Sequence, residues 1–327
     1  MKSYKEIAKM NALPKVSIMI PTYNQSEYII QAVQSAIDQD YSNKEIFVSD
    51  DSTDNQTEKL LKHFAEKGVI KYYKNTPRLG RVGNYYHSLR EYATGDWVLN
   101  LDGDDYLFNN SFITKTMKMI NENHDLSMVF GKEKAYHMQR NEYEDRPSGL
   151  SSNQIFDGNT LFFKKRELEI NFYHLSTIYN RLKAIEVGFY ENDCLGTDTI
   201  SLMKLLVNNK VGFLNEYAGA WRIHDSNDSF TENLDTLISN VKELYSLKPF
   251  LINNRFEIKL VDRWLDKTVI NRVLIYEIHF LSKRKVKLAF KLLKKIRMIN
   301  SRLYYKFITD LKIIGKLILI LVSSKKN

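Results

Sequence analysis

Short apolar runs alternate with amphipathic segments over residues 15–101. Each run is rich in β-branched or aromatic side chains and is followed by a polar turn; the runs are KVSIMI (15–20), EIFVSD (45–50), VIKYY (69–73) and DWVLNL (96–101). Their length and composition predict buried strands. The segments between them have apolar side chains at helical spacing, and Ser26 is the expected N-cap of the first helix. This alternation predicts an α/β fold with a mostly parallel sheet flanked by helices.

The pattern changes near residue 230. Before it, the sequence predicts helices over 153–165 and 197–209, a polar connection at KEKAYHMQRNEYEDRPSG, and further strands at SMVFGK (127–132), STIYN (176–180), GFLNEY and AGAWRI. From residue 231 to 322 only helical spacing remains. We therefore expect an α/β domain over residues 1–230 and an all-helical C-terminal region over residues 231–327.

Charge follows the same division. The 327-residue chain has a net charge of +9, but residues 231–327 hold 21 Lys/Arg and 8 Asp/Glu, a balance of +13, so residues 1–230 carry −4. A basic region on a slightly acidic body indicates an anionic partner, either a membrane surface or nucleic acid. The single cysteine, Cys194, cannot form an internal disulfide, which favours a reducing compartment. No apolar run suits a signal peptide or a membrane-spanning helix, so we expect a cytoplasmic location.

Three carboxylates follow the fourth predicted strand. Asp102, Asp104 and Asp105 in LDGDDYL would project from its carboxyl end, where open α/β sheets bind their ligands. Closely spaced carboxylates repel one another, and a hard divalent cation with oxygen ligands can hold them ionised together. The alternative is a solvated acidic turn before a helix that Asn109 or Asn110 caps.

Two more polar segments follow strands at the same edge of the predicted sheet. PTYN (21–24) follows the first strand and SDDSTDN (49–55) follows the second. Asp, Ser and Thr are also common turn and N-cap residues, so Ser52 or Asp54 is expected to cap the next helix in either case. Three polar segments at one end of a sheet nevertheless favour a binding site there.

The order of these segments resembles the family 2 glycosyltransferases, which have the GT-A fold. The matching segments are KVSIMIPTYN, EIFVSDDSTDN and GDWVLNLDGDD, and the resemblance covers residues 15–230. The sequence departs from the family pattern at Ser49, where the family has an aspartate, and at Asp51, where a small residue is usual. The resemblance implies a glycosyltransferase that uses a nucleotide-sugar donor, with UDP as the expected carrier.

The resemblance also implies roles for individual residues. Asp50 matches the aspartate that binds the base, and Tyr23 offers a ring on which the base can stack. Asp102 and Asp104 match the pair that holds a divalent cation, manganese or magnesium, on the donor diphosphate. The residues expected to bind the nucleotide-sugar are Pro21, Thr22, Tyr23, Asp50, Arg81, Asn84, Asp102, Gly103, Asp104 and Arg222.

Two later segments complete the resemblance. In LGTDTISLMKLL, Asp198 takes the position of the catalytic base, whereas without the resemblance it would be a first-turn residue favoured by the helix dipole. In WRIHDSNDS, Arg222 would face the diphosphate and His224 the metal. The expected metal ligands are Asp102, Asp104 and His224, and the residues expected on the acceptor side are Glu191 and Asp105.

These roles imply a single displacement that inverts the anomeric configuration. Asp198 would take the proton from an acceptor hydroxyl, while the cation and Arg222 neutralise the charge that develops on the departing diphosphate. The resemblance implies an acceptor that is a glycan or a lipid-linked glycan of surface polysaccharide biosynthesis.

The basic tail combines apolar and charged faces. On the predicted helix over 281–299, the apolar face holds Leu281, Leu288, Leu292, Ile296 and Ile299, and the opposite face holds Arg284, Lys287, Lys291, Lys294 and Lys295. The last segment, LKIIGKLILILVSSKKN, is too short to cross a bilayer but suits a helix in the membrane interface. We therefore expect peripheral attachment to the anionic inner face of the cell membrane. The alternative is an ordinary helical subdomain that packs its apolar stripe on the catalytic body.

Other classes of protein fit parts of the sequence. A nucleic-acid-binding protein would explain the pI of 9.2, but the lysines alternate with an apolar stripe and not with aromatics suited to base stacking, so we expect no nucleic-acid partner. A catalytically inactive glycosyltransferase-like partner protein would not need Asp102, Asp104, Asp198 and Arg222, which are all present. A nucleotidyltransferase normally has a Gly-rich basic loop near its first strand, and the sequence has none there.

Overall fold

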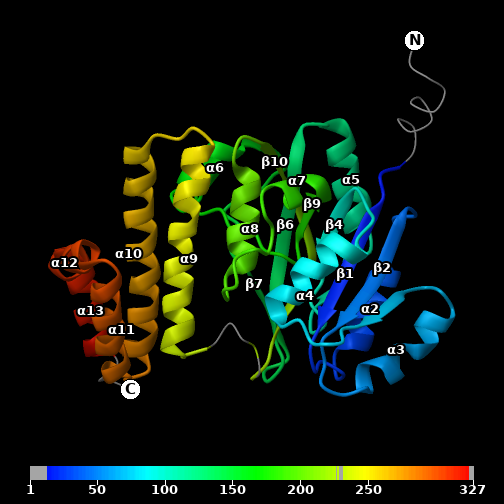
Figure 1. The fold of residues 1–327 in the computed structure, drawn as a ribbon, viewed down its shortest axis with the longest axis horizontal. Helices are drawn as coiled ribbons and strands as arrows, with labels where there is room; N and C mark the ends of the chain where they lie inside the picture. Colours follow the sequence, from blue (N-terminus) through cyan, green and yellow to red (C-terminus); the bar gives the residue numbers. More distant parts are fainter. Residues whose placement is uncertain (1–12, 226, 228–230, 324–327) are drawn as a thin grey trace, which may run out of the picture. The chain divides into compact units, whose positions relative to one another are not determined.

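The computed structural model describes residues 13–225, 227 and 231–323 of the chain. Its backbone forms two compact units, one of Met1–Asp193 and Thr197–Ser226 and the other of Cys194–Gly196 and Asn227–Asn327. All strands of the described residues belong to the first unit, which we call the catalytic unit. The second, which we call the helical unit, holds the five helices drawn in yellow to red in Figure 1.

The first half of the sheet is parallel. β1 (Val16–Thr22) lies between β2 (Lys44–Asp50) and β4 (Trp97–Asn100), and β3 (Lys71–Lys74) pairs with β2. The connecting helices are α2 (Ile29–Ile37), α3 (Gln56–Glu66) and α4 (Arg81–His87), which continues as the π-helical turn η1 (Ser88–Tyr92). The expected α/β alternation is therefore confirmed. Because these strands run in one direction, β1, β2 and β4 end at the same edge, and the polar segments lie there.

The second half of the sheet is mixed. The strand order is β3-β2-β1-β4-β9-β6-β10-β5. β9 (Thr177–Asn180) runs antiparallel between β4 and β6 (Leu126–His137), and β10 (Lys210–Ile223) runs parallel to β6. The remaining strands are short and antiparallel: β5 (Tyr106–Leu107) and β8 (Gln154–Asp157) on β10, and β7 (Glu142–Asp145) on β6.

Three predictions for this half are wrong. The stretch expected to be a polar connection continues β6 and forms β7, and the two expected closing strands are the single strand β10. β10 shifts its register against β6 twice between Phe213 and Ala220, which breaks the alternation of apolar and polar positions within one continuous strand. The helix expected over 153–165 begins only after β8, as α6 (Gly158–Lys164).

Apolar side chains cover both faces of the sheet. Ile18, Ile46 and Leu99 belong to a cluster that includes buried residues of α2, α3 and α5 (Phe112–Glu122). On the other face, Phe47 packs edge-on against Tyr92 of η1. The helices α7 (Arg181–Glu186) and α8 (Thr197–Leu206) pack against β9 and β6. The two faces explain why successive residues of β1 and β2 are almost all apolar.

Several helices begin later than the sequence predicts. α2 begins after Tyr28, α3 after Asn55 and α5 after Ser111, and none of these residues makes a capping bond through its side chain. The cap expected at Ser26 is therefore wrong, whereas Asp54 accepts the amide of Gln56 at 3.0 Å and Asn109 that of Ser111 at 3.2 Å. Ser26 instead donates a hydrogen bond to the side chain of Gln56 at 3.2 Å. These polar side chains bond across the edge of the sheet, which local spacing does not reveal.

The helical unit confirms the expected helical character of residues 231–322. Its helices are α9 (Leu234–Asn253), α10 (Ile258–Ser282), α11 (Val286–Ile299), α12 (Ser301–Thr309) and α13 (Leu311–Ser323). Asn233 caps the start of α9, and its side chain accepts the amides of Asp235 and Thr236. The buried side chains that hold the helices together include Leu244, Leu247, Val261, Leu265, Val269, Leu292, Ile296, Leu303 and Phe307.

The apolar stripe of the tail is divided between the interior and the surface of this unit. Leu292 and Ile296 on α11 are buried, and on α13 Ile313 is also buried. In contrast, Leu311 and Leu319 of α13 are 83% and 70% exposed. Within the part of the chain that the structure describes, no helix is both long enough and apolar enough to cross a membrane.

Candidate active site

The end of β1 brings an aromatic ring to the edge of the sheet. Thr22 is the last residue of the strand, and its hydroxyl bonds to the side chain of Gln25 at 3.0 Å. The next residue, Tyr23, is 46% exposed, and the guanidinium of Arg78 lies 4.4 Å from its ring centroid. Pro21 is buried within the strand. The exposed ring offers a flat surface on which a base can stack.

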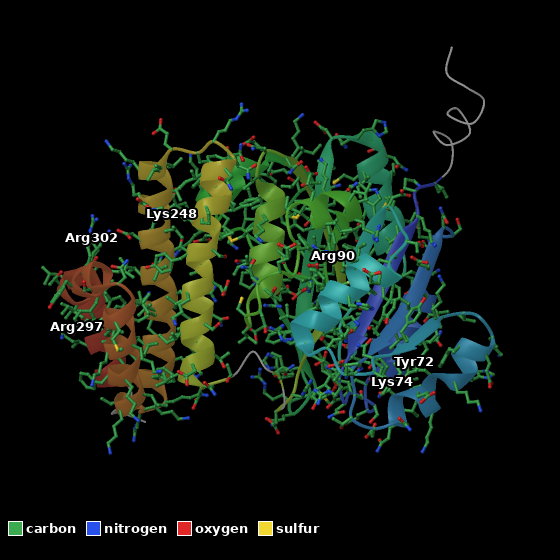
Figure 2. The ribbon with its side chains drawn as sticks, viewed as in Figure 1. Tyr72, Lys74, Arg90, Lys248, Arg297 and Arg302 are labelled. Atoms are coloured by element: carbon green, nitrogen blue, oxygen red, sulfur yellow. The ribbon has the colours of Figure 1, made fainter. Side chains whose placement is uncertain are left out.

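The end of β2 carries a buried carboxylate with three donors. Asp50 accepts the amide of Ser52 at 2.8 Å, the hydroxyl of Tyr72 at 2.6 Å and the ammonium of Lys74 at 3.1 Å. Tyr72 and Lys74 come from β3, the neighbouring strand (Figure 2). Burial and the hydrogen bond to Asp50 raise the pKa of Tyr72 well above its ordinary value, so this hydroxyl remains a donor. Asp50 is therefore held in one orientation at the expected base-binding position.

Asp51, where the family has a small residue, anchors the following loop. Its buried carboxylate accepts the backbone amides of Leu79 at 2.7 Å and Gly80 at 2.9 Å, and Arg78 lies 3.7 Å away. Gly80 has a φ of 75°, a conformation that favours glycine. Arg81, the first residue of α4, follows directly. Asp51 thus fixes the loop that carries Arg81 to the site, a role that sequence reasoning missed.

Asn84 is buried and bonded to the end of β2. Its amide donates to the carbonyl of Ser49 at 2.9 Å, and its oxygen accepts from the hydroxyl of Ser49 at 2.5 Å and the amide of Asn75 at 3.1 Å. The Ser49 hydroxyl is a donor here, which an ionised aspartate could not be. The serine at position 49, where the family has an aspartate, therefore has a structural reason. The expected contact of Asn84 with the nucleotide stays a prediction.

Asp102 follows β4 and is held by two donors. Its Oδ1 atom accepts the hydroxyl of Tyr85 at 2.9 Å and the amide of Asn100 at 2.8 Å. Burial and the charge of Asp104 raise the pKa of Asp102 to about 6, although both hydrogen bonds oppose this. Asp102 is thus partly buried and held by two donors, so the acidic turn is not the freely solvated turn that was the alternative.

Gly103 allows the acidic turn to pass close to β1. A Cβ atom at this position would lie 2.6 Å from the hydroxyl oxygen of Thr22 and 2.7 Å from the side-chain oxygen of Gln25. Both distances are shorter than a van der Waals contact allows. Only glycine therefore brings the main chain between the two aspartates against the end of β1.

Asp104 meets a histidine from the end of the catalytic unit. The Nε2 atom of His224 lies 3.1 Å from the Oδ2 atom of Asp104. The imidazole stacks on the ring of Tyr28, with the centroids 5.0 Å apart and the planes at 26°. The structure thus brings together two residues that are 120 positions apart in the chain, as the resemblance implied.

Arg222 ties β10 to the acidic turn. Its amide donates to Asp105 at 2.8 Å, its Nε atom to the carbonyl of Asp104 at 2.6 Å and its Nη2 atom to Gln31 at 2.6 Å. The guanidinium also lies 4.9 Å from the ring centroid of Tyr28. Burial and the charge of Asp104 raise the pKa of Asp105 well above its ordinary value. Asp105 thus points inward, and its expected place on the acceptor side stays a prediction.

The side-chain oxygen and nitrogen atoms at the acidic turn suit a divalent cation only in part. Among the described residues, no group of three His, Cys, Asp or Glu side chains is close enough together to hold a metal ion. Asp104 and His224 supply one oxygen and one nitrogen within 3.1 Å of each other. Burial first, and the charge of Asp104 second, raise the pKa of Asp102, and a hard cation bound beside it would favour the ionised carboxylate. The chemistry of these residues therefore fits manganese or magnesium.

Asp198 lies in the first turn of α8 and is half-buried. Burial raises the pKa of Tyr85 well above its ordinary value, and the charges of Asp102 and Asp198 both add to this. Tyr85 is therefore within electrostatic reach of both carboxylates. Glu191, expected on the acceptor side, is exposed and pairs with Arg90 at 3.0 Å. The structure thus relates Asp198, but not Glu191, to the acidic turn.

A buried ion pair also lies within reach of Asp198. Glu133 of β6 pairs with Arg146, whose guanidinium lies 3.6 Å from the ring centroid of Tyr173 and 4.5 Å from that of Trp221. Burial raises the pKa of Glu133 to about 7 against the effect of Arg146, and the charge of Asp198 contributes. Both residues lie in the stretch that the sequence predicted to be a polar connection, and no role was predicted for them. Only the extension of β6 puts Glu133 in the sheet.

Other residues of the candidate site were also not predicted from the sequence. Tyr85 follows Arg81 by four residues on α4, so helical spacing could have placed it on the same face. Tyr28, the residue just before α2, and Gln31 of α2 both contact Arg222. No local signal connects these positions, because the contact depends on the strand order.

Comparison with known proteins supports the arrangement. The model of glycosyl transferase family 2 matches residues 17–189, which is more than half of the chain. The GalNAc(5)-diNAcBac-PP-undecaprenol beta-1,3-glucosyltransferase of Campylobacter jejuni is 33% identical over 121 residues, which are 36% of this chain and 38% of that protein. The chain spans less than half the length of the curated relatives it matches.

Solved structures show the same fold. Staphylococcus aureus TarS 1–349 in complex with UDP-GlcNAc matches with a TM-score of 0.65 and 18% identity, covering 88% of this chain and 82% of that one. The mannosyltransferase PcManGT of Pyrobaculum calidifontis, in complex with GDP-Man and Mn²⁺, matches with a TM-score of 0.54 and 16% identity, covering 96% and 88%. The chain therefore belongs to glycosyl transferase family 2 and has the GT-A fold.

Proposed function

We propose that this glycosyltransferase moves a sugar, with inversion, from a UDP-linked donor to a hydroxyl of a glycan or lipid-linked glycan. The process would be the synthesis of a surface polysaccharide or glycoconjugate. One observation supports this most: Asp104, His224 and Arg222 meet at the carboxyl edge of the sheet, and the charge of Asp198 acts on Tyr85, whose hydroxyl donates to Asp102 in the same turn.

The donor site would begin at the ends of β1 and β2. Tyr23 offers an exposed ring for the base, and Asp50 is held in place by Tyr72 and Lys74. The loop fixed by Asp51 carries Arg81 to the same edge. UDP is the proposed carrier because the fold neighbour TarS was solved with UDP-GlcNAc.

The diphosphate would lie at the acidic turn. When bound there by Asp102, Asp104 and His224, a manganese or magnesium ion would supply positive charge to the diphosphate. Arg222 is held by Gln31 and by the carbonyl of Asp104, so its guanidinium needs no reorganisation to face negative charge. Arg222 would thus neutralise charge as the glycosyl–phosphate bond breaks.

Asp198 would be the general base. It would accept the proton of the acceptor hydroxyl as the oxygen attacks the anomeric carbon from the face opposite the leaving group, and a single displacement of this kind inverts the configuration. Its place at the start of a packed helix would fix the carboxylate close to the acceptor oxygen, which lowers the entropic part of the barrier.

The helical unit would attach the enzyme to the anionic inner face of the cell membrane. Leu311, Ile318 and Leu319 of α13 are exposed apolar side chains in a region with a charge balance of +13. Flotation of the full chain with anionic vesicles tests this, with Leu319→Glu compared against Leu182→Glu in the catalytic unit. Both leucines are 70% exposed, so only the first change should reduce flotation. Equal behaviour of the two variants, or no flotation of the wild type, contradicts the attachment.

A screen of sugar nucleotides tests the catalytic proposal. Release of free nucleoside diphosphate is measured for each donor with a panel of glycan acceptors, with manganese and with EDTA. We expect release from one or a few UDP-sugars that requires manganese and acceptor. If the folded chain releases nothing from any donor, the inactive partner protein becomes the better interpretation.

A further inference from the structure

The helical unit contains a cavity that the glycosyl transfer does not use. Its volume is about 520 Å³, and residues of α9, α10, α12 and the turn before α12 line it. Leu265 is the single apolar side chain among the ten lining residues. Charged and polar residues therefore make up most of its lining.

The lining has an excess of positive charge. Five cationic side chains and two carboxylates give a charge of +3; the cations are Lys248, Lys259, Arg263, Arg302 and Lys306, and the carboxylates are Asp262 and Asp266. Lys248 pairs with Asp262 at 2.5 Å, and Lys306 lies 3.5 Å from Asp266. Both carboxylates are therefore matched by a lysine, and three cations remain.

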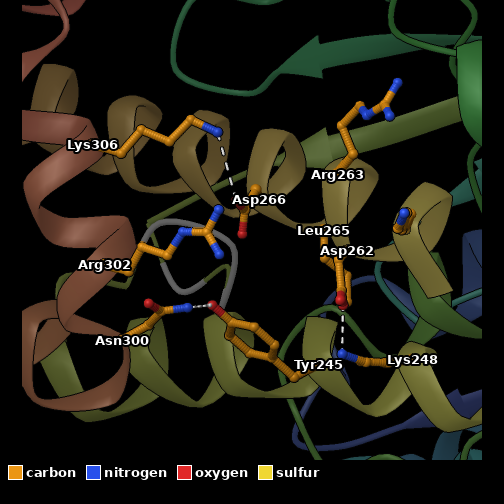
Figure 3. Close-up of a pocket in the computed structure, with 10 residues that line it drawn as sticks. Tyr245, Lys248, Asp262, Arg263, Leu265, Asp266, Asn300, Arg302 and Lys306 are labelled. Atoms are coloured by element: carbon orange, nitrogen blue, oxygen red, sulfur yellow. Dashed lines mark hydrogen bonds and ion pairs between the residues drawn. The ribbon is translucent and has the colours of Figure 1, made fainter.

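The remaining cations have no polar partner in the part of the chain that the structure describes. Among the described residues, Lys259, Arg263 and Arg302 make no ion pair or hydrogen bond through their side chains. In Figure 3, Arg302 reaches from α12 towards Asp266 on α10, beside Lys306. Like charges that share a cavity repel one another, and a bound anion would remove this repulsion.

The neutral polar groups also favour an oxyanion. Asn300 donates its amide to the hydroxyl oxygen of Tyr245 at 3.2 Å, so the hydroxyl hydrogen of Tyr245 is left to donate elsewhere. Arg302 offers a planar set of donors that can bind two oxygens of one phosphate at once. The volume exceeds that of a single small ion.

We propose that this cavity binds a diphosphate group. The lining holds five cations against two carboxylates; Arg302 would be the main contact, with the hydroxyl of Tyr245 as a further donor and the paired Lys306 beside it (Figure 3). The diphosphate could belong to a polyprenyl lipid in the membrane or to a free nucleotide, and both offer the same chemistry. Binding here depends on residues of the helical unit alone, so a test of this site can fail while the proposed glycosyl transfer is correct, and the reverse.

Calorimetric titration of the full chain with inorganic pyrophosphate in EDTA tests the site, because EDTA removes metal-dependent binding at the acidic turn. We expect Arg302→Ala to weaken binding by roughly tenfold or more, the effect of losing a charged hydrogen-bonded pair. The matched control is Lys294→Ala, an exposed cation on α11 that does not line the cavity. Arg302→Lys should bind with intermediate affinity, because it keeps the charge but loses the second donor.

Two further measurements identify the source of the diphosphate. One is flotation with phosphatidylcholine vesicles that contain or lack polyprenyl diphosphate, and the other is titration with UDP in EDTA. If flotation with the polyprenyl diphosphate vesicles depends on Arg302, the bound diphosphate belongs to the lipid. If binding of UDP depends on Arg302, it belongs to the nucleotide. The proposal is overturned if wild type binds no pyrophosphate, or if the Arg302 and Lys294 variants bind equally while thermal unfolding shows that both are folded.

Discussion

The catalytic unit and the helical unit place their charged side chains differently. In the catalytic unit, Asp50 and Asp105 are buried at strand ends, and main-chain or side-chain donors from other strands hold them. In the helical unit most charged side chains lie on the outside, and the cations that line its cavity are exposed or half-exposed. A sheet edge collects side chains from distant parts of the chain, whereas helices expose one face each.

This difference shows how each unit obtains specificity. The buried carboxylates of the catalytic unit are oriented before any ligand arrives, which suits chemistry that depends on exact placement of charge. The exposed cations of the helical unit are less constrained and attract anions through net charge, which suits retention at a surface or of a phosphate. Substitutions in the two units should therefore change different measurements.

The largest expected effect comes from the acidic turn. Asp104→Ala should reduce metal-dependent transfer by at least roughly a thousandfold, because charge on the leaving diphosphate is no longer neutralised. The exposed control Asp38→Ala, which carries the same change on the surface of the catalytic unit, should keep full activity. Nucleoside diphosphate release with manganese and with EDTA measures the effect, and full turnover of Asp104→Ala in EDTA would disprove the metal assignment.

The next effect concerns the base. Asp198→Asn should lower transfer by at least roughly a hundredfold while donor affinity stays nearly constant, because the change keeps size and polarity but removes basicity. Turnover and donor affinity, measured separately, check this. Glu191→Gln is the matched control, since that carboxylate is exposed and pairs with Arg90. If Asp198→Asn keeps wild-type transfer and the Glu191 variant loses it, the two roles must be exchanged.

A smaller effect should appear in the stability of the helical unit. Glu277 of α10 is 2% exposed, and burial raises its pKa from 4.5 to about 8. The folded state therefore holds a proton that the unfolded state releases, so the contribution to stability is complete below pH 4.5 and is lost as the pH rises through 8. Glu277→Gln should remove this dependence and raise the unfolding temperature at pH 8.5 by several degrees.

Thermal unfolding at pH 5 and pH 8.5 tests the prediction for Glu277. The exposed Glu257, at the start of the same helix, gives the control variant Glu257→Gln, which should follow the wild type at both pH values. A Glu277→Gln variant that loses stability at pH 8.5 would show that the carboxylate is charged and has a partner in the folded chain.

The smallest expected effect concerns stability in the catalytic unit, and its pH dependence is opposite to that of Glu277. Burial alone would raise the pKa of Glu45, but hydrogen bonds from Lys15, Ser17 and Thr94 lower it to about 2. Its contribution to stability is thus present above pH 4.5 and is lost as the pH falls through 2. Glu45→Gln should unfold at a lower temperature than wild type at pH 7, and the difference should shrink towards pH 2. A constant difference over this range would mean that the charge of Glu45 is not involved.

Much of the catalytic unit could be predicted from the sequence because its signals are local. Apolar runs closed by polar turns marked β1, β2 and β4, and the rule that ligands bind at the carboxyl ends of parallel strands placed the polar segments together. The resemblance predicted that His224 and Asp104 share a site, and the structure places the two side chains 3.1 Å apart, while their role as metal ligands stays a prediction. The N-cap prediction for Ser26 was wrong because this hydroxyl donates across the loop to Gln56.

The tertiary structure alone decided which neighbours each functional residue has. Tyr85 binds Asp102, Gln31 binds Arg222, and Glu133 comes near Asp198 only because β6 and β10 pair beside the strands of the first half. The same holds for the tail, where spacing grouped Ile313 with Leu319 but packing buries the first and exposes the second. The sequence by itself determined the elements and the residue types at their ends, because periodicity and turn chemistry act over a few residues. Strand order and helix packing join residues more than a hundred positions apart, and no local pattern records those contacts.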